Sequence, residues 1–563
     1  MKIAVELVVR ILSELDPKAL HVCMRLSKGF NALIKNSPIL RYHIALFSRG
    51  FVDGASDLPL YPTTFSRQKA LLDLEDSWYN FCPRMRTRIE GGNFNVLAKR
   101  FDGLWAEYRC HPVDGPRLTL TTLPSIVMGV GLEDSKERTR EIKLEDEISD
   151  FTIHDHQDLL ILADRSTTQN GSLEYTLHLR TLSQNTSHPK ANKSSLKLCT
   201  LSLPTADDDD EYGERFVYQV FGHMLMVLIV LKYEESLCRS FLRIWNWETG
   251  DVLWTHDGEK RIISSFSHVA ADLLMLAEHA SPLTPDGLAP QLSLWSLQEF
   301  PNETLKLLNV QTLLLPPIKN GKTYPVHDEE FLTLDDFNIL SSPNPIDLAT
   351  MAPSASPFHF DMMHRVFALV LAVSVHDRRL PENSTTTTFC ICIPFKTILK
   401  SIYSGPLMDC RPNQNQFNIL SKKSTAGPRT IKQLGLAWED WGRKGACFNH
   451  VNAESYNFSV SGMRCSYLED NGGFTIMDFS PSILQKGATD AQLVTRGDQK
   501  YWTVLKRPRT GTLGVGPAIF DIETPGEVLF VRTGCELSDV EGAMVDMEHV
   551  LILRGHDVDV WTM

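Results

Sequence analysis

Most of this chain consists of short apolar stretches that have the length of β-strands. From residue 91 onward such runs recur between turn residues, and clear examples are LLILAD, YTLHLRTL, FLRIWNW, RVFALVLAVSV and EVLFVRT. They are rich in β-branched and aromatic residues, which favour strands. Few credible long helices separate them. The region therefore predicts a mainly antiparallel β structure, in which strands joined by turns pair with their neighbours.

Length and charge narrow the class of protein further. A chain of 563 residues predicts about two to four domains, or one repeat domain with a small companion. There are 56 basic and 69 acidic residues, a net charge of −13, which argues against nucleic acid as the main partner. Glu6 and Arg10 interrupt the apolar part of any signal peptide. No run approaches the ~18 apolar residues of a membrane span. We expect a soluble intracellular protein, cytoplasmic or nuclear, with no membrane partner.

The first fifty residues differ from the rest, because their apolar residues recur at helical spacing. One helix face is traced by Ile3, Leu7, Ile11, Leu12 and Leu15. Asp16-Pro17 and Ser37-Pro38 each combine a capping side chain with a proline suited to the first helical position. Short helices in so few residues bury little surface alone. This surplus of apolar side chains indicates a docking module.

These residues resemble the F-box family. The run VELVVRILSELDPKALHVCMRLSKGFNALI is similar to its pattern of Leu-Pro-x-Glu-Leu, an Ile-Leu and leucine core, and Val-Ser-Arg-x-Trp. Lys28 stands in place of the Arg, Phe30 in place of the Trp, and Ile3-Ala4 in place of the Leu-Pro start. The resemblance implies binding of the Skp adaptor, which links the F-box to cullin. The residues expected to contact the adaptor are Leu7, Ile11, Leu15, Leu20, Leu26 and Phe30. Alternatively, these residues only pack the head against the rest of the chain.

The continuation extends this resemblance. SPILRYHIALFSRGFVDG and a helix opened by Ser66 and ending near Trp78 are similar to a large group of fungal F-box proteins, in which a long β-rich region follows. The expected domains are an F-box at residues 1–50, a helical linker at 51–90 and a β-rich, partner-binding domain at 91–563. The expected fold class is α+β multidomain, with a small all-α head.

Three tryptophans suggest how the β-rich region is organised. Trp245 precedes a turn and a new strand, Trp295 occupies a similar place, and Trp561 ends the segment RGHDVDVWTM. They resemble the tryptophan near the end of the third strand in degenerate WD-repeat blades. We expect a β-propeller of about six to eight blades with long insertions, closed by the last strand. Two packed β-domains are the alternative.

Several polar or turn-rich segments are candidates for those insertions. They are Ser183–Ser195, Asp207–Glu211, Ser341–Pro357 and Asn413–Pro428. The acidic run Asp207–Glu211 is either a solvated loop or a site that attracts a basic partner. The segment Trp438–Gly442 either plugs the propeller or binds a peptide.

Signals for catalysis or metal binding are weak. His154-Asp155-His156 has no second ligand cluster at zinc-like spacing. Cys390 and Cys392 would share one face of a strand, either as buried apolar residues or as a pair of ligands. No nucleophile elbow, phosphate loop or dinucleotide fingerprint is present. We therefore expect neither an enzyme nor a cofactor or metal.

These observations together predict a substrate-recruiting subunit of a Skp–cullin–F-box ubiquitin ligase, whose β-rich region binds an unidentified protein. Such a subunit would act by proximity, raising the effective concentration of a substrate lysine near the conjugating enzyme. A protein-interaction scaffold that recruits no cullin is the alternative. An enzyme site hidden in a propeller pocket is a third possibility.

Overall fold

The structure is a computed structural model of all 563 residues. It describes residues 4–54, 58–91, 97–101, 103–111, 113, 115–131, 138–201, 213–233, 237–258, 261–280, 290–298, 305–316, 330–342, 356–377, 385–403, 435–451, 453–481, 492–496, 499–506 and 530–563. The acidic run Asp207–Glu211, the segment Asn413–Pro428 and most of Ser341–Pro357 lie outside these residues.

The N-terminal part is a group of four helices, which we call the head. Its helices are α1 (Val5–Ser13), α2 (Pro17–Leu26), α3 (Lys28–Asn36) and α4 (Pro38–Arg49). Asp16 caps α2 by accepting a hydrogen bond from the backbone of Ala19 at 2.9 Å, and Ser27 caps α3 by accepting one from Phe30 at 3.1 Å. The boundaries therefore follow from capping side chains visible in the sequence.

Two short elements then connect the head to the β region. They are β1 (Phe51–Asp53) and α5 (Thr64–Tyr79), and we call them the anchor segment. Helix α5 begins slightly before the predicted Ser66, because Thr63 is its cap. Thr63 and Ser66 bond each other's backbone amides in a capping box.

Within the described residues the remainder forms seven antiparallel sheets of four or six strands, which we number as blades. Blade 1 contains β3 (Leu97–Phe101), β4 (Leu104–His111), β5 (Gly115–Thr122) and β6 (Thr139–Lys143). Blade 2 contains β7 (Asp150–His154), β8 (Leu159–Thr167), β9 (Leu173–Thr181) and β10 (Ser195–Leu201). Blade 3 contains β11 (Gly213–Phe221), β12 (Met224–Tyr233), β13 (Leu237–Asn246) and β14 (Asp251–Gly258). Blade 4 contains β15 (Arg261–Ala270), β16 (Leu273–Ala280), β17 (Gln291–Gln298) and β18 (Lys306–Leu314).

The later blades carry additions. Blade 5 contains β19 (Glu330–Leu340), β21 (Val366–Asp377), β22 (Thr385–Pro394) and β23 (Cys447–Val451). Between its strands lie β20 (Phe358–Phe360), α6 (Phe395–Tyr403) and α7 (Trp438–Gly445). Blade 6 contains β24 (Phe458–Ser461), β25 (Arg464–Leu468), β26 (Gly473–Asp478), β29 (Phe530–Glu536), β28 (Gln499–Lys506) and β27 (Gln492–Arg496).

Blade 7 closes the ring with strands from both ends of the chain. It contains β30 (Gly542–Val545), β31 (His549–Arg554), β32 (Asp557–Thr562) and β2 (Met85–Ile89). Strand β2 pairs with β32 in antiparallel register, from Met85 opposite Thr562 to Ile89 opposite Val558. The last strand, β32, therefore closes the ring as expected, and it does so by pairing with β2. The segment expected as a helical linker accordingly contributes this strand to the ring, ahead of residue 91.

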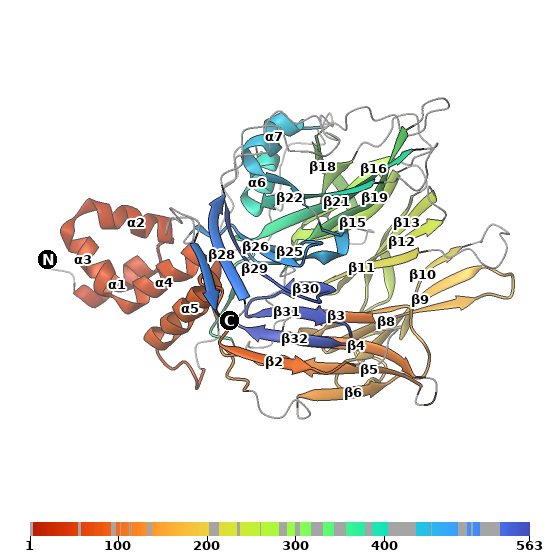
Figure 1. Ribbon diagram of the computed structural model, residues 1–563, viewed down its shortest axis with the longest axis horizontal. Coiled ribbons are helices and arrows are strands. Elements are labelled where there is room, and N and C mark those ends of the chain that lie inside the picture. The colour runs from red at the N-terminus through yellow and green to blue at the C-terminus, as the bar shows by residue number, and fades with distance from the viewer. Residues whose placement is uncertain are drawn as a thin grey trace.

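The sheets form a β-propeller, as predicted, and not two packed β-domains (Figure 1). First strands of successive blades contact one another, as in the pairs β7 and β11, β11 and β15, β15 and β19, and β24 and β30. The predicted tryptophans lie near the ends of third strands, where Trp245 and Trp561 are buried between sheets and Trp295 is partly buried. Gly250, at φ +78°, completes the turn after Trp245 in a left-handed conformation that favours glycine.

No helix among the described residues has the length and apolar character needed to cross a membrane.

Candidate functional site

The helices of the head bury one apolar side and expose another. Its own small core is centred on Leu12, Leu20, Ile34 and Leu40. Pointing away from that core, Leu7 is 55% exposed, Ile11 59% and Leu26 68%. Leu7 and Ile11 are four residues apart on α1 and therefore share a helix face. Apolar side chains left in water at this density indicate a surface that a partner covers.

The six residues predicted to contact an adaptor thus fall into two groups. Leu7, Ile11 and Leu26 are exposed, whereas Leu15 and Phe30 are half-buried against the core of the head. Leu20 has no exposed surface and lies in the core of the head, so its contact with an adaptor stays a prediction. Helical periodicity indicates that a residue lies on the apolar side of its helix. It does not say whether that side packs against the same chain or against another protein.

Sequence reasoning missed further exposed apolar residues on the same helices. Val5 is 59% exposed, Val22 57% and Ile39 50%. Val22 lies four residues before Leu26 on α2, the spacing that places two side chains on one face. That spacing was the signal that could have identified Val22. We call Leu7, Ile11, Val22 and Leu26 the apolar face, whereas Val5, two residues before Leu7, lies on another side of α1.

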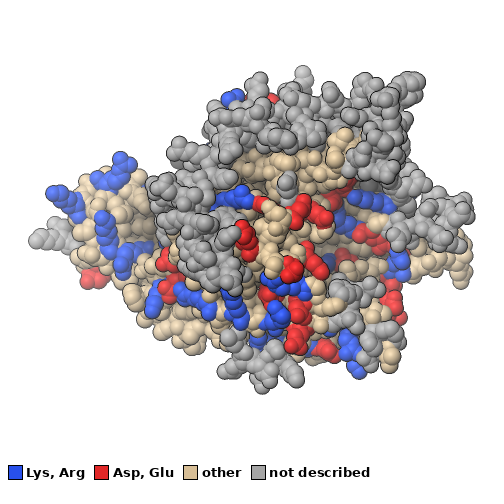
Figure 2. Space-filling view, in the orientation of Figure 1, with Lys and Arg blue, Asp and Glu red and all other residues tan. Residues whose placement is uncertain are grey.

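The head carries more basic than acidic side chains. Residues 4–50 contain seven Lys and Arg but three Asp and Glu, against a net charge of −13 for the chain. Arg10, Lys18, Arg25 and Lys28 are exposed, and Figure 2 shows the basic side chains gathered on the head. Exposed apolar residues on a domain with an excess of basic side chains suit a partner that offers an apolar groove and acidic side chains.

Comparison with known protein families decides what this helical head is. Residues 4–42 match the F-box domain. The chain has an N-terminal F-box domain. The match covers α1 to α3 and the start of α4, and so includes the whole apolar face.

Comparisons over the whole chain give low similarities. The WD40 domain of SCAP from fission yeast matches with 9% identity and a TM-score of 0.28, covering 85% of this chain and 97% of that one. A europium-containing methanol dehydrogenase matches with 8% identity and a TM-score of 0.28, covering 81% and 93%. No curated protein matches the sequence. The propeller assignment above rests on strand pairing.

The F-box domain is joined to the propeller by the end of α4 and by β1. Strand β1 pairs with β20, with Phe51 opposite Phe360. Because β20 lies in the connection between β19 and β21, this pair links the N-terminal region to blade 5. Tyr42 donates from its hydroxyl to Asp53 Oδ1 at 2.9 Å and Pro357 O at 3.2 Å. Helix α4 ends at Gly50, which has φ +75°. A Cβ added to this glycine would lie 3.0 Å from His364 Cβ. The last helix of the head is therefore fixed to blade 5.

A buried ion-pair triad fixes α5 to blade 6. Arg464 Nη2 donates to Glu75 Oε1 at 2.7 Å, and Arg464 Nε donates to Asp478 Oδ2 at 2.9 Å. All three side chains are over 90% buried. Burial raises the pKa of Glu75 and opposes the effect of Arg464. Burial alone would lower the pKa of Arg464, but the two carboxylates outweigh it and raise that pKa. The guanidinium also lies 4.7 Å from the Trp78 ring centroid.

The end of α5 is fixed to blade 7. Trp78 Nε1 donates to Met547 O at 2.9 Å, in the turn between β30 and β31. Phe81 packs against Phe474 and Trp561, with ring centroids 6.2 and 6.1 Å away. The backbone amide of Arg84 then bonds Thr562 O at 2.8 Å, just before β2. The head and the anchor segment together are thus held by three consecutive blades.

Three of the connections that contact the head and α5 lie on one face of the propeller. His364, Met463 and Met547 belong to the connections between first and second strands of blades 5, 6 and 7, and we call this side the head face. The opposite side, which we call the open face, carries the turns between second and third strands. Examples are residues 168–172, 469–472 and 554–557. Figure 1 shows the head on the left of the ring and the turn from β31 to β32 on the right.

The Trp438–Gly442 segment is part of the packing between blades 4 and 5. Trp438 and Trp441 are buried, and their ring centroids are 5.1 Å apart. Trp441 Nε1 donates to Leu314 O, at the end of β18, at 3.0 Å. A Cβ on Gly442 would lie 2.1 Å from the Trp438 ring, which explains why glycine follows the tryptophans. These tryptophans attach α7 to the ring.

The His154-Asp155-His156 segment lies at the end of β7. Burial, and then the neighbouring His156, lower the pKa of His154 to about 4. Among the described residues, these three side chains do not form a group whose ligand atoms converge on one point.

Proposed function

We propose that this protein is a substrate-recruiting subunit of a Skp–cullin–F-box ubiquitin ligase. The observation that carries the proposal is the exposed apolar face on a domain that matches the F-box. In this role the apolar face binds the Skp adaptor, and Leu7, Ile11 and Leu26 are the residues expected to enter its groove. Leu15 and Phe30 would support these residues from behind.

Rigid attachment of the F-box domain supports this role. A ligase subunit that works by proximity must hold its substrate at a defined place relative to the conjugating enzyme. The Glu75–Arg464–Asp478 triad, the β1–β20 pair and the β2–β32 pair each fix the chain directly after the domain to the propeller. The same attachment occupies the head face, so the open face is the side on which a protein substrate would bind.

We propose three parts: an F-box domain within residues 1–50, an anchor within 51–90 and a partner-binding propeller within 91–563. The propeller also includes strand β2, which comes from the anchor region. The substrate we propose is a protein that binds the open face.

Co-purification with the Skp adaptor and cullin tests the proposal. Leu26→Asp and Ile11→Asp each place a charge in the apolar contact and should abolish adaptor capture. Both side chains are exposed, so the melting temperature should stay at the wild-type value. Val252→Asp is the matched control, because Val252 is 44% exposed on blade 3, away from the head. It should retain adaptor and cullin.

Retention of the adaptor by both head variants would overturn the proposal. Capture of the adaptor without cullin would instead show an interaction scaffold.

A further inference from the structure

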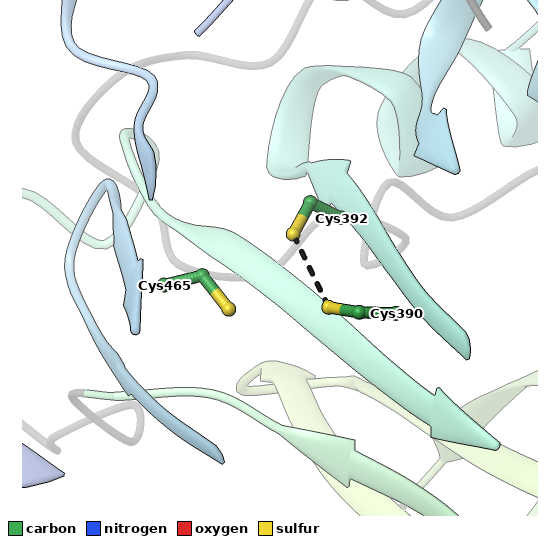
Figure 3. Close-up of side chains that lie close together, drawn as sticks. All are labelled: Cys390, Cys392 and Cys465. Atoms are coloured by element: carbon green, nitrogen blue, oxygen red, sulfur yellow. Dashed lines mark hydrogen bonds between the residues drawn. The ribbon is translucent and has the colours of Figure 1, made fainter. Parts of the chain in front are cut away.

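Three cysteine sulfurs converge between blades 5 and 6. Cys390 and Cys392 are two residues apart on β22, so they share one face of that strand, as the sequence indicated. Cys465 reaches toward them from β25 of the next blade (Figure 3). The Sγ atoms of Cys390 and Cys392 are 3.7 Å apart, and all three sulfurs lie within 4.8 Å of one another. None of the three residues has any exposed surface.

Their surroundings offer sulfur and almost nothing else. The cluster lies in an apolar layer that includes Val366, Val370, Val460 and Phe479. Strand β22 is paired on both sides, with β21 and β23, and β25 is paired with β24 and β26. Their backbone groups are therefore already used in ladder hydrogen bonds. Any ion at this point would be bound by the thiol groups.

The distances suit one ion bound by these sulfurs. Two sulfurs that each lie ~2.3 Å from one ion, at tetrahedral to trigonal angles, are about 3.7–4.0 Å apart. The Cys390–Cys392 separation is already in this range. Cys465 would need to move by a fraction of an ångström to about one ångström, which a change of side-chain rotamer angle within its well can supply.

We propose that Cys390, Cys392 and Cys465 form a three-sulfur site for a soft monovalent metal ion, Cu(I), that joins blades 5 and 6. Thiolate ligands select soft ions over Mg²⁺, Ca²⁺ or Mn²⁺. Structural Zn²⁺ takes four protein ligands, and a three-ligand zinc site completes its shell with water. An apolar, fully buried cluster disfavours that water. Cu(I) is therefore the ion that this ligand set fits best.

The remaining nearby cysteine does not complete a four-sulfur site. Cys447 is paired with Cys392 across the β22–β23 ladder. Its sulfur accepts a hydrogen bond from Asn449 Nδ2 at 3.2 Å and is not part of the converging group.

Binding here would reinforce the part of the ring that holds the F-box domain. Cys465 directly follows Arg464, the centre of the triad that fixes α5. The same two blades contact the head through His364 and Met463. An ion between them would resist separation of the blades at this interface.

Metal analysis of the full chain tests the site. The protein is purified under reducing, oxygen-free conditions from cells grown with added copper, and is also incubated with Cu(I) held by a competing chelator. We expect about one copper per chain, a sulfur-only shell in X-ray absorption, and a higher melting temperature than that of the metal-free protein. Cys390→Ala and Cys465→Ala should each lose most of the copper.

Cys535→Ala is the matched control, because Cys535 is equally buried on β29 in a different apolar cluster. It should bind copper as the wild type does. Copper uptake unchanged in Cys390→Ala, a shell containing nitrogen or oxygen, or preferential uptake of zinc would overturn the proposal. So would no copper uptake by the folded wild type, a result that does not depend on whether any variant folds.

Discussion

The two halves of the N-terminal region present their apolar residues in opposite directions. Helices α1 to α3 pack with the start of α4 around a small core and leave Leu7, Ile11, Val22 and Leu26 exposed. Helix α4 and the anchor segment instead bury Tyr42, Leu46, Phe51, Leu71, Leu74 and Trp78 in one cluster with blades 6 and 7. Both halves carry large apolar side chains. They differ in what covers the apolar side, which is the protein itself in one case and water in the other.

Substitutions in the two halves should therefore change different properties of the protein, its stability in one case and its binding in the other. Substitutions in the anchored half should act on folding, because its partners are already in place. Substitutions on the apolar face should act on binding, because its partner is another molecule.

The largest effect is expected at the buried triad. Arg464→Ala leaves Glu75 and Asp478 buried without their cation, and should lower the free energy of unfolding by about 3–5 kcal/mol. Arg464→Lys should rescue little, since one ammonium cannot reproduce two separately directed N–H donors. Denaturant unfolding of the full chain measures both. Lys197→Ala, at an exposed pair with Glu174, is the control and should cost under about 1 kcal/mol. Equal losses for the two sites would remove the distinction between anchor and surface.

The apolar face should give the next effect, on binding alone. Val22→Asp introduces a charge at a residue that is 57% exposed, and should weaken adaptor affinity roughly ten- to hundredfold, or about 1.4–2.8 kcal/mol. The melting temperature should not change. Leu20→Asp, two residues earlier in the buried core, should instead unfold the head. Calorimetric titration and thermal unfolding distinguish the two outcomes, and a wild-type affinity for Val22→Asp would exclude Val22 from the contact.

A smaller effect is expected where α4 turns into β1. Gly50→Ala forces a side chain into a left-handed conformation, and should cost about 1–2 kcal/mol. Gly29→Ala is the matched control, because Gly29 lies in α3 and its nearest atom to an added Cβ is 3.7 Å away. It should stabilise the head by roughly 0.5–1 kcal/mol, since alanine is the better helix former. Thermal unfolding would contradict this account if both changes had the same sign.

The smallest expected effect is a pH dependence of the free energy of unfolding. It arises at His549, close to the Met547 carbonyl that accepts from Trp78. His549 Nδ1 lies 2.9 Å from Asp546 Oδ1, and its other ring nitrogen donates to Pro124 O. Burial lowers the pKa of His549, but Asp546 outweighs burial and raises that pKa above 6.5. The stabilisation is therefore fully present below pH 6.5 and is lost as the pH rises through the folded pKa. The stability gap between wild type and His549→Gln should shrink over that range, and a constant gap would show that this histidine does not titrate.

Helix boundaries and blade positions were predicted from the sequence more accurately than the contacts between distant residues. Asp16 and Ser37 marked helix boundaries correctly, because capping depends on local backbone groups. Trp245 and Trp561 marked blades, because a large ring near the end of a third strand fills the gap between sheets. The blade count fell within the predicted range of about six to eight.

Contacts between distant residues were beyond local reasoning. Leu20 and Leu26 both fit the helical pattern, yet one is buried and the other exposed, since burial depends on how the helices pack. Glu75 and Arg464 are separated by 389 positions, and nothing near either residue indicates its partner. The convergence of Cys465 on Cys390 and Cys392 is of the same kind.

Ring closure by β2 also sets an order of events during synthesis. Strand β2 leaves the ribosome several hundred residues before β32, so its pairing partner does not exist while most of the propeller is being made. The F-box helices can fold early, because their own core is local, but their attachment through Phe81, Trp561 and Met547 must wait for the final blade. A nascent chain therefore displays its apolar face before the ring behind it is complete. Chaperones that cover such surfaces would meet this protein at its N-terminus first.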